Sequence, residues 1–348
     1  MNKPVSLLAG IVLFHFSFPA LSEPVVSAIV ETVPVGIDGD AADDSVIVTG
    51  STPYETRIIG TQKKGGLYVY DLKGRVVQEV MGSRPNNVDA RAGFPWPEGK
   101  GHIVVTSDRT DNSVRLFRFD DMKRRLEPVA RASVPTEFQE VYGVAVGKIG
   151  SVFVVVATDK DGDVAQWHLS IDGDRVTATE TRRFALGSIA EGCVIDDEHG
   201  NLFVSQELEG LWRFPLDPSP VDKGSFVDRV GPNGNLVADV EGVTLWTAAK
   251  GEGYLIVSAQ GASRFNVYDR RAPFAYRGSF RVVDNAAGTI DGVSETDGVE
   301  ATSASLGPRF PRGLIVVQDG DNTLPATTQN FKYVSWADVE RVLGLSSQ

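Results

Sequence analysis

The chain has 348 residues, 42% of them apolar, with 36 glycines, 18 prolines and a formal net charge of −12. This length and composition fit a globular protein of one or two domains, which can bury a sizeable core without disulfide bonds. Cys193 is the only cysteine, so an intrachain disulfide is excluded. The acidic balance argues against a nucleic-acid-binding protein.

The first 22 residues have the pattern of a secretory signal peptide. Lys3 supplies positive charge, LLAGIVLFHFSF is a short apolar run, and Ala20 and Ser22 are small residues at positions −3 and −1 of a cut before Glu23. The run is too short to span a bilayer comfortably, and no later segment is long and apolar enough. We therefore expect an exported, soluble protein, periplasmic or secreted, with a single domain over residues 23–348.

Six hairpin units recur along the rest of the chain. Each has an apolar run of strand length, a turn rich in Gly, Asp, Asn or Ser, and a second strand of alternating character. The first strands of these hairpins start 45 to 59 residues apart, near Ile58, Ile103, Val152, Leu202, Leu255 and Leu314. A short strand precedes each hairpin and a further strand, such as VVQEV or GSFRVV, follows it. Six four-stranded units of this length predict an all-β fold, a six-bladed β-propeller with antiparallel blades.

The two ends of the chain carry further signals. A propeller must join its ends, so we expect PVVSAIVETV, which begins at Pro24, to add a strand to the sheet of the last blade. A helical period of useful length appears at SWADVERVLG, from Ser335 to Gly344.

The short strand before each hairpin opens on a polar residue, which is followed by glycine in four units. In a propeller this strand lines the central channel, so residues at one position of it form a ring at one channel mouth. The glycines let the backbones approach closely near the axis. Like charges gathered there raise one another's pKa unless cations sit among them. The expected ring consists of Asp44, Asn87, Tyr142, Glu191, Glu241 and Asp297.

Neighbouring carboxylates favour a metal site over a merely solvated rim of acids. Asp239 lies two residues before Glu241, Asp291 lies six before Asp297, and Glu207 ends the strand after the Glu191 turn. Asp40 and Asp43 stand beside Asp44. Such hard oxygen ligands suit Ca²⁺, with Mg²⁺ or Mn²⁺ as lesser options, and the scarcity of histidine argues against zinc.

Cations recur in the turns that are expected to face the same mouth. They are Lys63 and Lys64 in QKKGG, Arg109 in SDRTD and Lys160 in TDKDGD, and Arg91 follows the strand NNVD. Any one of them could be an ordinary solvated side chain. Their recurrence at one position of the repeat favours the capture of phosphate groups.

Longer strings carry a family resemblance over residues 40–343. DAADD, TQKKGGLYVYDLKG, NNVDAR, EVYGVAV, AEGCVIDDEHGNLFVSQE, DVEGVTLW, GYLIVSAQG, TDGVE and PRGLIVVQDGDN together resemble the β-propeller phytases. These are calcium-dependent enzymes that remove phosphate from inositol hexakisphosphate. The chain departs from the family pattern at Ser45, which replaces a proline, and at Gln206, which replaces an acid.

The resemblance implies roles for individual residues. Substrate phosphates would be bound by Lys63, Lys64, Arg109 and Lys160. The catalytic calcium ions would be held by Tyr142, Glu191, Glu207, Asp239, Glu241 and Asp297. Further calcium sites would use Asp43, Asp44, Asp291, Asp319, Asp321 and Asn322. Lys63, Arg109, Tyr142 and Glu191 would take part in catalysis itself.

The implied activity is that of a phosphoric monoester hydrolase of the 3-phytase type. A metal-activated water would attack phosphorus, and phytate or its calcium complex would be the substrate. We expect a monomer with several bound calcium ions and no nucleic-acid or membrane partner. Two alternatives stay open, a non-catalytic calcium-dependent propeller that binds a partner and a lactonase-like calcium propeller. Four cations around the metal site favour phosphate chemistry over a lactonase.

Overall fold

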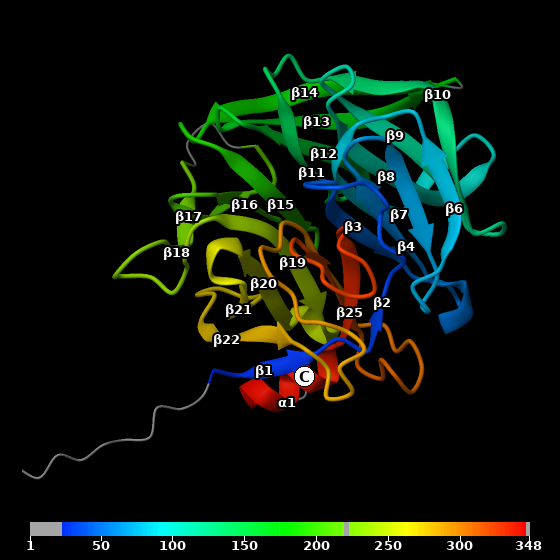
Figure 1. The fold of residues 1–348 in the computed structure, drawn as a ribbon. Helices are drawn as coiled ribbons and strands as arrows, with labels where there is room; N and C mark the ends of the chain where they lie inside the picture. The colour runs from blue at the N-terminus through cyan, green and yellow to red at the C-terminus, as the bar shows by residue number, and fades with distance from the viewer. Residues whose placement is uncertain (1–22, 174, 219–222, 346–348) are drawn as a thin grey trace, which may run out of the picture.

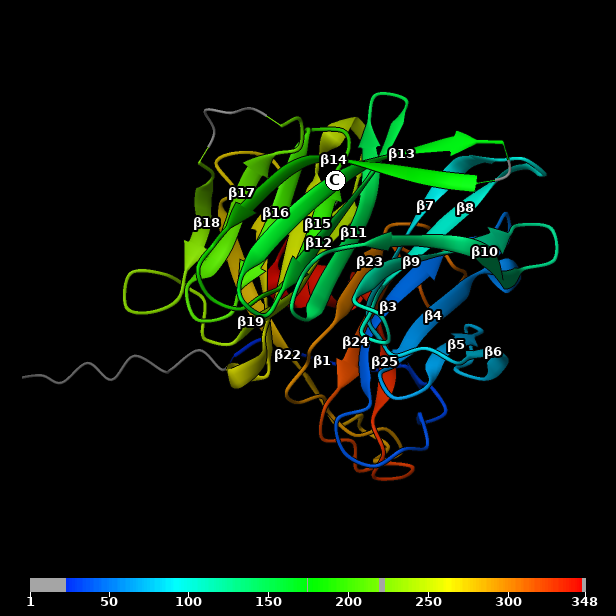
Figure 2. The same ribbon diagram turned by 90° about the horizontal axis from the view of Figure 1, so that it is seen from above.

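The structure is a computed structural model that describes residues 23–173, 175–218 and 223–345. The predicted signal peptide, residues 1–22, lies outside them. The described chain is almost entirely β-strand, and six sheets stand around a common axis as the blades of a propeller (Figures 1 and 2). The predicted six-bladed architecture is therefore confirmed.

The first three blades follow one another along the chain, each running from the channel outward. Blade 1 contains β3 (Ala42–Val48), β4 (Arg57–Gln62), β5 (Gly66–Tyr70) and β6 (Val76–Met81). Blade 2 contains β7 (Pro85–Trp96), β8 (Gly99–Asp108), β9 (Ser113–Asp120) and β10 (Arg125–Pro135). Blade 3 contains β11 (Val141–Ile149), β12 (Val152–Asp159), β13 (Asp163–Asp172) and β14 (Arg175–Ala185).

The last three blades complete the ring. Blade 4 contains β15 (Ala190–Asp196), β16 (Asn201–Gln206), β17 (Gly210–Pro215) and β18 (Ser225–Arg229). Blade 5 contains β19 (Val240–Thr247), β20 (Gly253–Ala259), β21 (Arg264–Asp269) and β22 (Tyr276–Val283). Blade 6 contains β23 (Val299–Thr302), β24 (Leu314–Asp319) and β25 (Asn330–Ser335). The inner strands β3, β7, β11, β15, β19 and β23 contact one another in this order, and β23 returns to β3.

The segment after Glu23 closes the ring and belongs to two blades. β2 (Val30–Glu31) pairs antiparallel with β25 and becomes the outer strand of blade 6, as predicted. β1 (Val25–Ser27) pairs parallel with β22 and extends blade 5 to five strands, which the sequence did not predict. Within ten residues, one segment therefore joins the edges of the last two blades.

Hydrophobic packing between neighbouring blades forms the core. The middle strands β16, β20 and β24 are buried at every residue, because each blade is covered on both faces by its neighbours. This explains why their sequences are nearly continuous apolar runs. Cys193 is buried in the cluster between blades 3 and 4, as expected for a small apolar side chain.

Helices are few in the described part of the chain. α1 (Trp336–Leu343) confirms the predicted C-terminal helix, and its Trp336 ring stacks on Trp246 with centroids 5.0 Å apart. Short 3₁₀ helices occupy Pro53–Glu55, Ala249–Gly251 and Gln260–Ala262. No helix of the described residues is both long and apolar enough to cross a membrane.

Candidate active site and metal centre

A backbone hydrogen bond that recurs at one channel mouth defines equivalent positions in the blades. The residue after the second strand of a blade donates its N–H to a carbonyl at the start of the first strand. The pairs are Lys63 to Ala41 (2.8 Å), Arg109 to Arg84 (2.9 Å), Lys160 to Glu140 (3.3 Å), Glu207 to Ile189 (3.1 Å) and Gln260 to Asp239 (2.9 Å). In these five blades the ring at this mouth lies two residues beyond the acceptor. In blade 6 the ring residue is Asp297, whose carbonyl oxygen faces Gly242 as that of Glu241 faces Gly192.

The ring therefore differs from the prediction in the first two blades. Its members are Asp43, Asn86, Tyr142, Glu191, Glu241 and Asp297. Asp44 and Asn87 lie one residue further along, at the position that glycine occupies in the other four blades. Because that glycine was the marker for the ring in the sequence, its replacement shifted the predicted position by one.

The glycines beside the ring permit the close approach of neighbouring inner strands, as predicted. A Cβ atom on Gly192 would overlap the carbonyl oxygen of Glu241, and one on Gly242 would lie 2.6 Å from the carbonyl oxygen of Asp297. Gly242 N–H also donates to the same Asp297 oxygen at 2.8 Å. The carboxylates of adjacent blades are thereby brought together near the axis.

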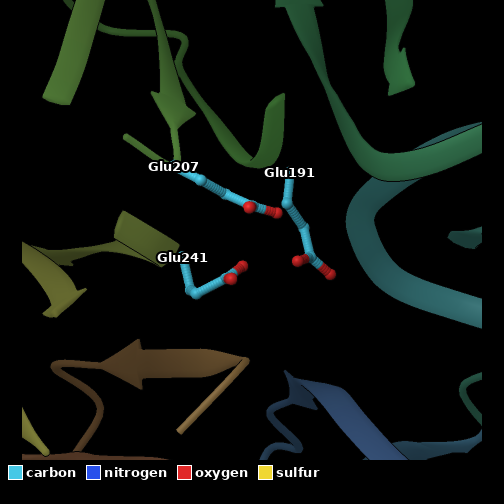
Figure 3. A group of neighbouring side chains, drawn as sticks. All are labelled: Glu191, Glu207 and Glu241. Atoms are coloured by element: carbon cyan, nitrogen blue, oxygen red, sulfur yellow. The ribbon is translucent and has the colours of Figure 1, made fainter. Parts of the chain in front are cut away.

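Three glutamates converge at the mouth and form a candidate metal centre (Figure 3). Glu191, Glu207 and Glu241 come from β15, the end of β16 and β19, and one carboxylate oxygen of each lies within 4.8 Å of the others. Glu241 Oε2 is buried and has no hydrogen-bond partner among the described residues. Closely spaced hard oxygens with an unpartnered atom fit a cation such as Ca²⁺.

The pKa values of the three glutamates also favour a bound cation. Burial, and then the charge of Asp43, raise the pKa of Glu191 to about 7. Burial and the nearby Asp239 raise the pKa of Glu207 to about 7, and burial together with the charge of Glu191 raises the pKa of Glu241 well above its ordinary value. Like charges at this separation cannot all ionise cheaply, so a bound cation would relieve their repulsion.

Lys63 lies among acids at the first-blade side of the mouth. Its Nζ is 2.5 Å from Asp40, 2.7 Å from Asp43 and 3.1 Å from Asp297. Burial opposes its charge, but the acids, Asp43 first, raise the pKa of Lys63 well above its ordinary value. Lys64 is exposed and donates to the Asp38 carbonyl oxygen at 2.7 Å.

Arg109 and Lys160 meet at a single carboxylate. Glu140 Oε1 lies 2.7 Å from Lys160 Nζ and 3.5 Å from Arg109 Nη1. Lys160 Nζ also lies 5.0 Å from the centre of the Tyr142 ring. The hydroxyl of Tyr142 neighbours the glutamates, and the charge of Glu191 is the largest cause of the raised pKa of Tyr142.

The rim of the mouth is thus divided by charge. The position after the second strand holds a cation in blades 1 to 3 and an uncharged or acidic residue in blades 4 to 6. The six residues are Lys63, Arg109 and Lys160, then Glu207, Gln260 and Gly320. One half of the rim thus presents cationic side chains, and the other half includes the carboxylate of Glu207 and the amide of Gln260.

A second group of predicted calcium ligands surrounds a lysine instead. Lys332 Nζ is fully buried, contacts Asp291, and lies 2.5 Å from Asp319 Oδ2 and 3.3 Å from Asn322 Oδ1. The Gly292 carbonyl oxygen accepts a further hydrogen bond at 2.9 Å. One ammonium group offsets one of these two carboxylate charges, and the carboxylates also accept hydrogen bonds from the N–H groups of Thr323 and Ser294, so the group has donors in place without a metal ion. Asp321 is exposed and lines a surface pocket that Asp291 also lines, but it makes no ion pair with Lys332.

Two other residues lie away from the mouth. Asp44 accepts hydrogen bonds from the N–H groups of Val88 (3.1 Å) and Ser45 (2.8 Å) inside the channel, where burial raises its pKa. Arg91 was expected near the mouth, but it donates to the carbonyl oxygens of Val146 and Ile195 deeper along the inner strands.

The structure also adds residues that the sequence did not single out. Asn86 Nδ2 donates to Glu191 Oε1 at 2.7 Å, and Gln260 Nε2 donates to Asp297 Oδ1 at 2.5 Å. Both side chains orient a ring carboxylate from a different blade. Gln260 could have been found from the repeat alone, since it shares the position of Lys63 and Glu207. Glu140 could not, because its partners are defined only in three dimensions.

Comparisons with known proteins agree with this site. A family model described as phytase matches residues 5–347. A curated 3-phytase from Bacillus subtilis (strain 168) is 38% identical over 331 residues, which cover 92% of this chain and 85% of that protein. The resemblance drawn from the sequence motifs is thus confirmed, and the chain belongs to the phytase family.

Proposed function

We propose that this protein is a calcium-dependent phytase that releases inorganic phosphate from phytate as a 3-phytase-type phosphomonoesterase. The observation that carries the proposal is the divided rim, where the Glu191, Glu207 and Glu241 cluster faces the Arg109 and Lys160 pair. Phosphate esters need both cationic ligands and charge compensation at the reacting phosphorus. The name of the Bacillus relative supports the same activity and substrate.

Calcium would be held at the mouth by Glu191, Glu207 and Glu241, with Asp239, Asp297, Asp43 and Tyr142 close around them. When bound, it supplies positive charge for phosphate oxygens and lowers the pKa of water. The oxygen-only donor set and its number of carboxylates favour Ca²⁺ over softer metals.

Side chains of the protein would bind the substrate and orient the carboxylates of the mouth. Arg109 and Lys160 bind and orient a phosphate group and neutralise its charge. Asn86 holds Glu191, and Gln260 holds Asp297, in the orientation needed at the mouth. Lys63 limits the repulsion between Asp43 and Asp297. Its place at the cation position of blade 1 is the ground on which we assign it to a second phosphate of the same substrate.

We further propose that the protein is exported, to the periplasm or the medium, and acts as a monomer. The support for export is the signal-peptide pattern of residues 1–22. An acidic protein would repel free phytate over most of its surface, so phytate carrying calcium is the more favourable form to approach.

The test is a phosphate-release assay on phytate, with added calcium and with a chelator. Wild type should release phosphate only with calcium. Arg109→Ala should be slower by about 100-fold or more, because it removes charge neutralisation at the reacting phosphate. Arg118→Ala is the matched control, since Arg118 pairs with Glu127 on the outer strands of blade 2.

The assay also separates the alternatives. Calcium binding without phosphate release would favour a non-catalytic binding propeller. Hydrolysis of a lactone in place of phytate would favour a lactonase, although the cations of blades 1 to 3 have no role in that chemistry. Phosphate release that persists in the chelator would remove calcium from the proposal.

A further inference from the structure

One carboxylate joins the two cations of the phosphate half of the rim. Glu140 precedes β11 of blade 3, and its Oε1 contacts both Lys160 Nζ (2.7 Å) and Arg109 Nη1 (3.5 Å). These cations come from blades 3 and 2. A single oxygen that accepts from both stands where a phosphate oxygen bound by both would stand.

Neither cation depends on the carboxylate of Glu140 for its position. The side chain of Arg109 is only 15% exposed, so packing confines it, and its Nε is buried without a partner among the described residues. Lys160 is anchored by its own N–H bond to the Glu140 carbonyl and by the face of the Tyr142 ring. The buried Nε shows that Arg109 has donor capacity that Glu140 does not use.

Glu140 itself is free to move. Its side chain is 43% exposed, so it can turn into solvent without burying a charge. The cations that face its carboxylate, the Lys160 ammonium and the Arg109 guanidinium, both contact a single oxygen, Oε1.

We propose that Glu140 is a specificity-determining residue, an internal anion that occupies the phosphate position between Arg109 and Lys160 until substrate displaces it. This inference rests on the proposed role of the two cations in binding substrate phosphate. A singly charged anion gains little by displacing a carboxylate, whereas a doubly charged phosphate monoester gains a second charge interaction. The carboxylate returns as product leaves, which weakens the hold on inorganic phosphate.

The experiment compares Glu140→Gln with wild type by calorimetric titration with inorganic phosphate, at a calcium concentration below the solubility limit of calcium phosphate. Glutamine keeps the shape and an acceptor oxygen but removes the competing charge. Phosphate should bind about three- to tenfold more tightly to the variant, the range expected for loss of a partly exposed ion pair. KM for phytate should fall by a similar factor, without an increase in kcat.

Glu127→Gln is the matched control, because Glu127 bridges Lys123 (2.9 Å) and Arg118 (3.3 Å) away from the mouth. It should leave phosphate affinity unchanged. Should Glu140→Gln fold poorly, Glu140→Asp shortens the side chain, weakens both contacts and should give a smaller tightening in the same direction.

Unchanged or weaker phosphate binding by a folded Glu140 variant would overturn the inference, and would assign Glu140 a purely structural or pre-organising role. Because the titration requires no turnover, it is separable from the proposed function. Tighter binding together with no phosphate release from phytate would support Glu140 as the internal anion and contradict the phytase assignment.

Discussion

Two buried lysines show how single residues balance charge in this fold. Lys63 and Lys332 each contact carboxylates that are far apart in sequence, and each is at most 7% exposed. Around Lys332 one ammonium bridges two carboxylates, which also accept hydrogen bonds from the N–H groups of Thr323 and Ser294. Around Lys63 they continue into the glutamate cluster, where Glu241 Oε2 is left without a partner. A buried lysine therefore holds carboxylates together in a structural group at Lys332, whereas at Lys63 the neighbouring acids extend to an unpartnered oxygen that a cation could bind.

Lys332→Met should destabilise the protein by about 3–5 kcal/mol, because it removes the ammonium partner of the buried carboxylates Asp291 and Asp319. The measurement is the free energy of unfolding by denaturant, in chelator. Lys123→Met is the control, since Lys123 is 62% exposed and its surface pairs contribute at most about 1 kcal/mol. The same measurement is repeated with calcium. If Lys332→Met is then as stable as wild type, a calcium ion at Asp291 and Asp319 has replaced the ammonium group, and Lys332 is not the native cation of that group.

At the scale of elements, the closing segment makes blades 5 and 6 depend on each other. Phe331 N–H donates to Thr32 Oγ1 at 3.0 Å, and Thr32 N–H donates to the Phe331 carbonyl at 2.8 Å. β1 then continues onto β22 a few residues away. A change in this short segment therefore acts on the edges of two sheets at once.

Thr32→Val should cost about 1–3 kcal/mol, because it keeps the shape of the side chain but leaves the buried Phe331 N–H without its acceptor. Thermal unfolding in the presence of calcium would measure the loss. Thr177→Val in the outer strand of blade 3 should have little effect, since its hydroxyl contacts Ser170 at an exposed position. Equal melting temperatures for the two variants would mean that the closing pair adds nothing to stability.

Most of the strands could be predicted from the sequence, because the middle strands of the blades are buried on both faces. Their apolar runs and polar turns placed the hairpins of all six blades, and the ends of the chain gave β2 and α1. The pairing of β1 with β22 could not be predicted from the sequence, because a strand of three residues carries no register signal and its partner is set by the neighbouring sheet.

In the candidate site, the predicted ring was wrong by one residue at Asp44 and Asn87, where the glycine that marks the position is absent. Asn86 and Glu140 were missed because their contacts with Glu191 and Arg109 cross from one blade to another, whereas the repeat position of Gln260 could have been recognised.

At the scale of the whole molecule, the channel carries charge along its length. Beyond the mouth it is lined by Asp44, Asp89 and Glu300, and it opens into a pocket that also contains Arg91 and Asp197. Burial raises the pKa of Asp89 to about 6 and that of Glu300 to about 8. For Glu300 the charge of Asp89 adds to the effect of burial, while the Thr244 hydroxyl and Arg91 oppose it.

These shifts predict a pH dependence with a definite sign. A carboxyl group whose pKa is higher in the folded state stabilises the fold below its unfolded value, and that contribution is lost as pH rises through the folded value. Stability without divalent ions should therefore fall between about pH 4 and pH 8. Glu300→Gln should flatten the upper part of this fall, measured as melting temperature against pH. Glu127→Gln is the control, and parallel curves for wild type and Glu300→Gln would contradict the prediction.

The closing strand also sets the order in which the molecule can be completed during synthesis. Thr32 and its partner Phe331 are 299 positions apart in the sequence. At roughly 5–20 residues per second, the ribosome needs on the order of 15–60 s to make the partner of a strand that has already emerged. The first described strands are thus among the last to pair. A chain stopped short of β25 would leave blade 6 without its outer strands and the ring open.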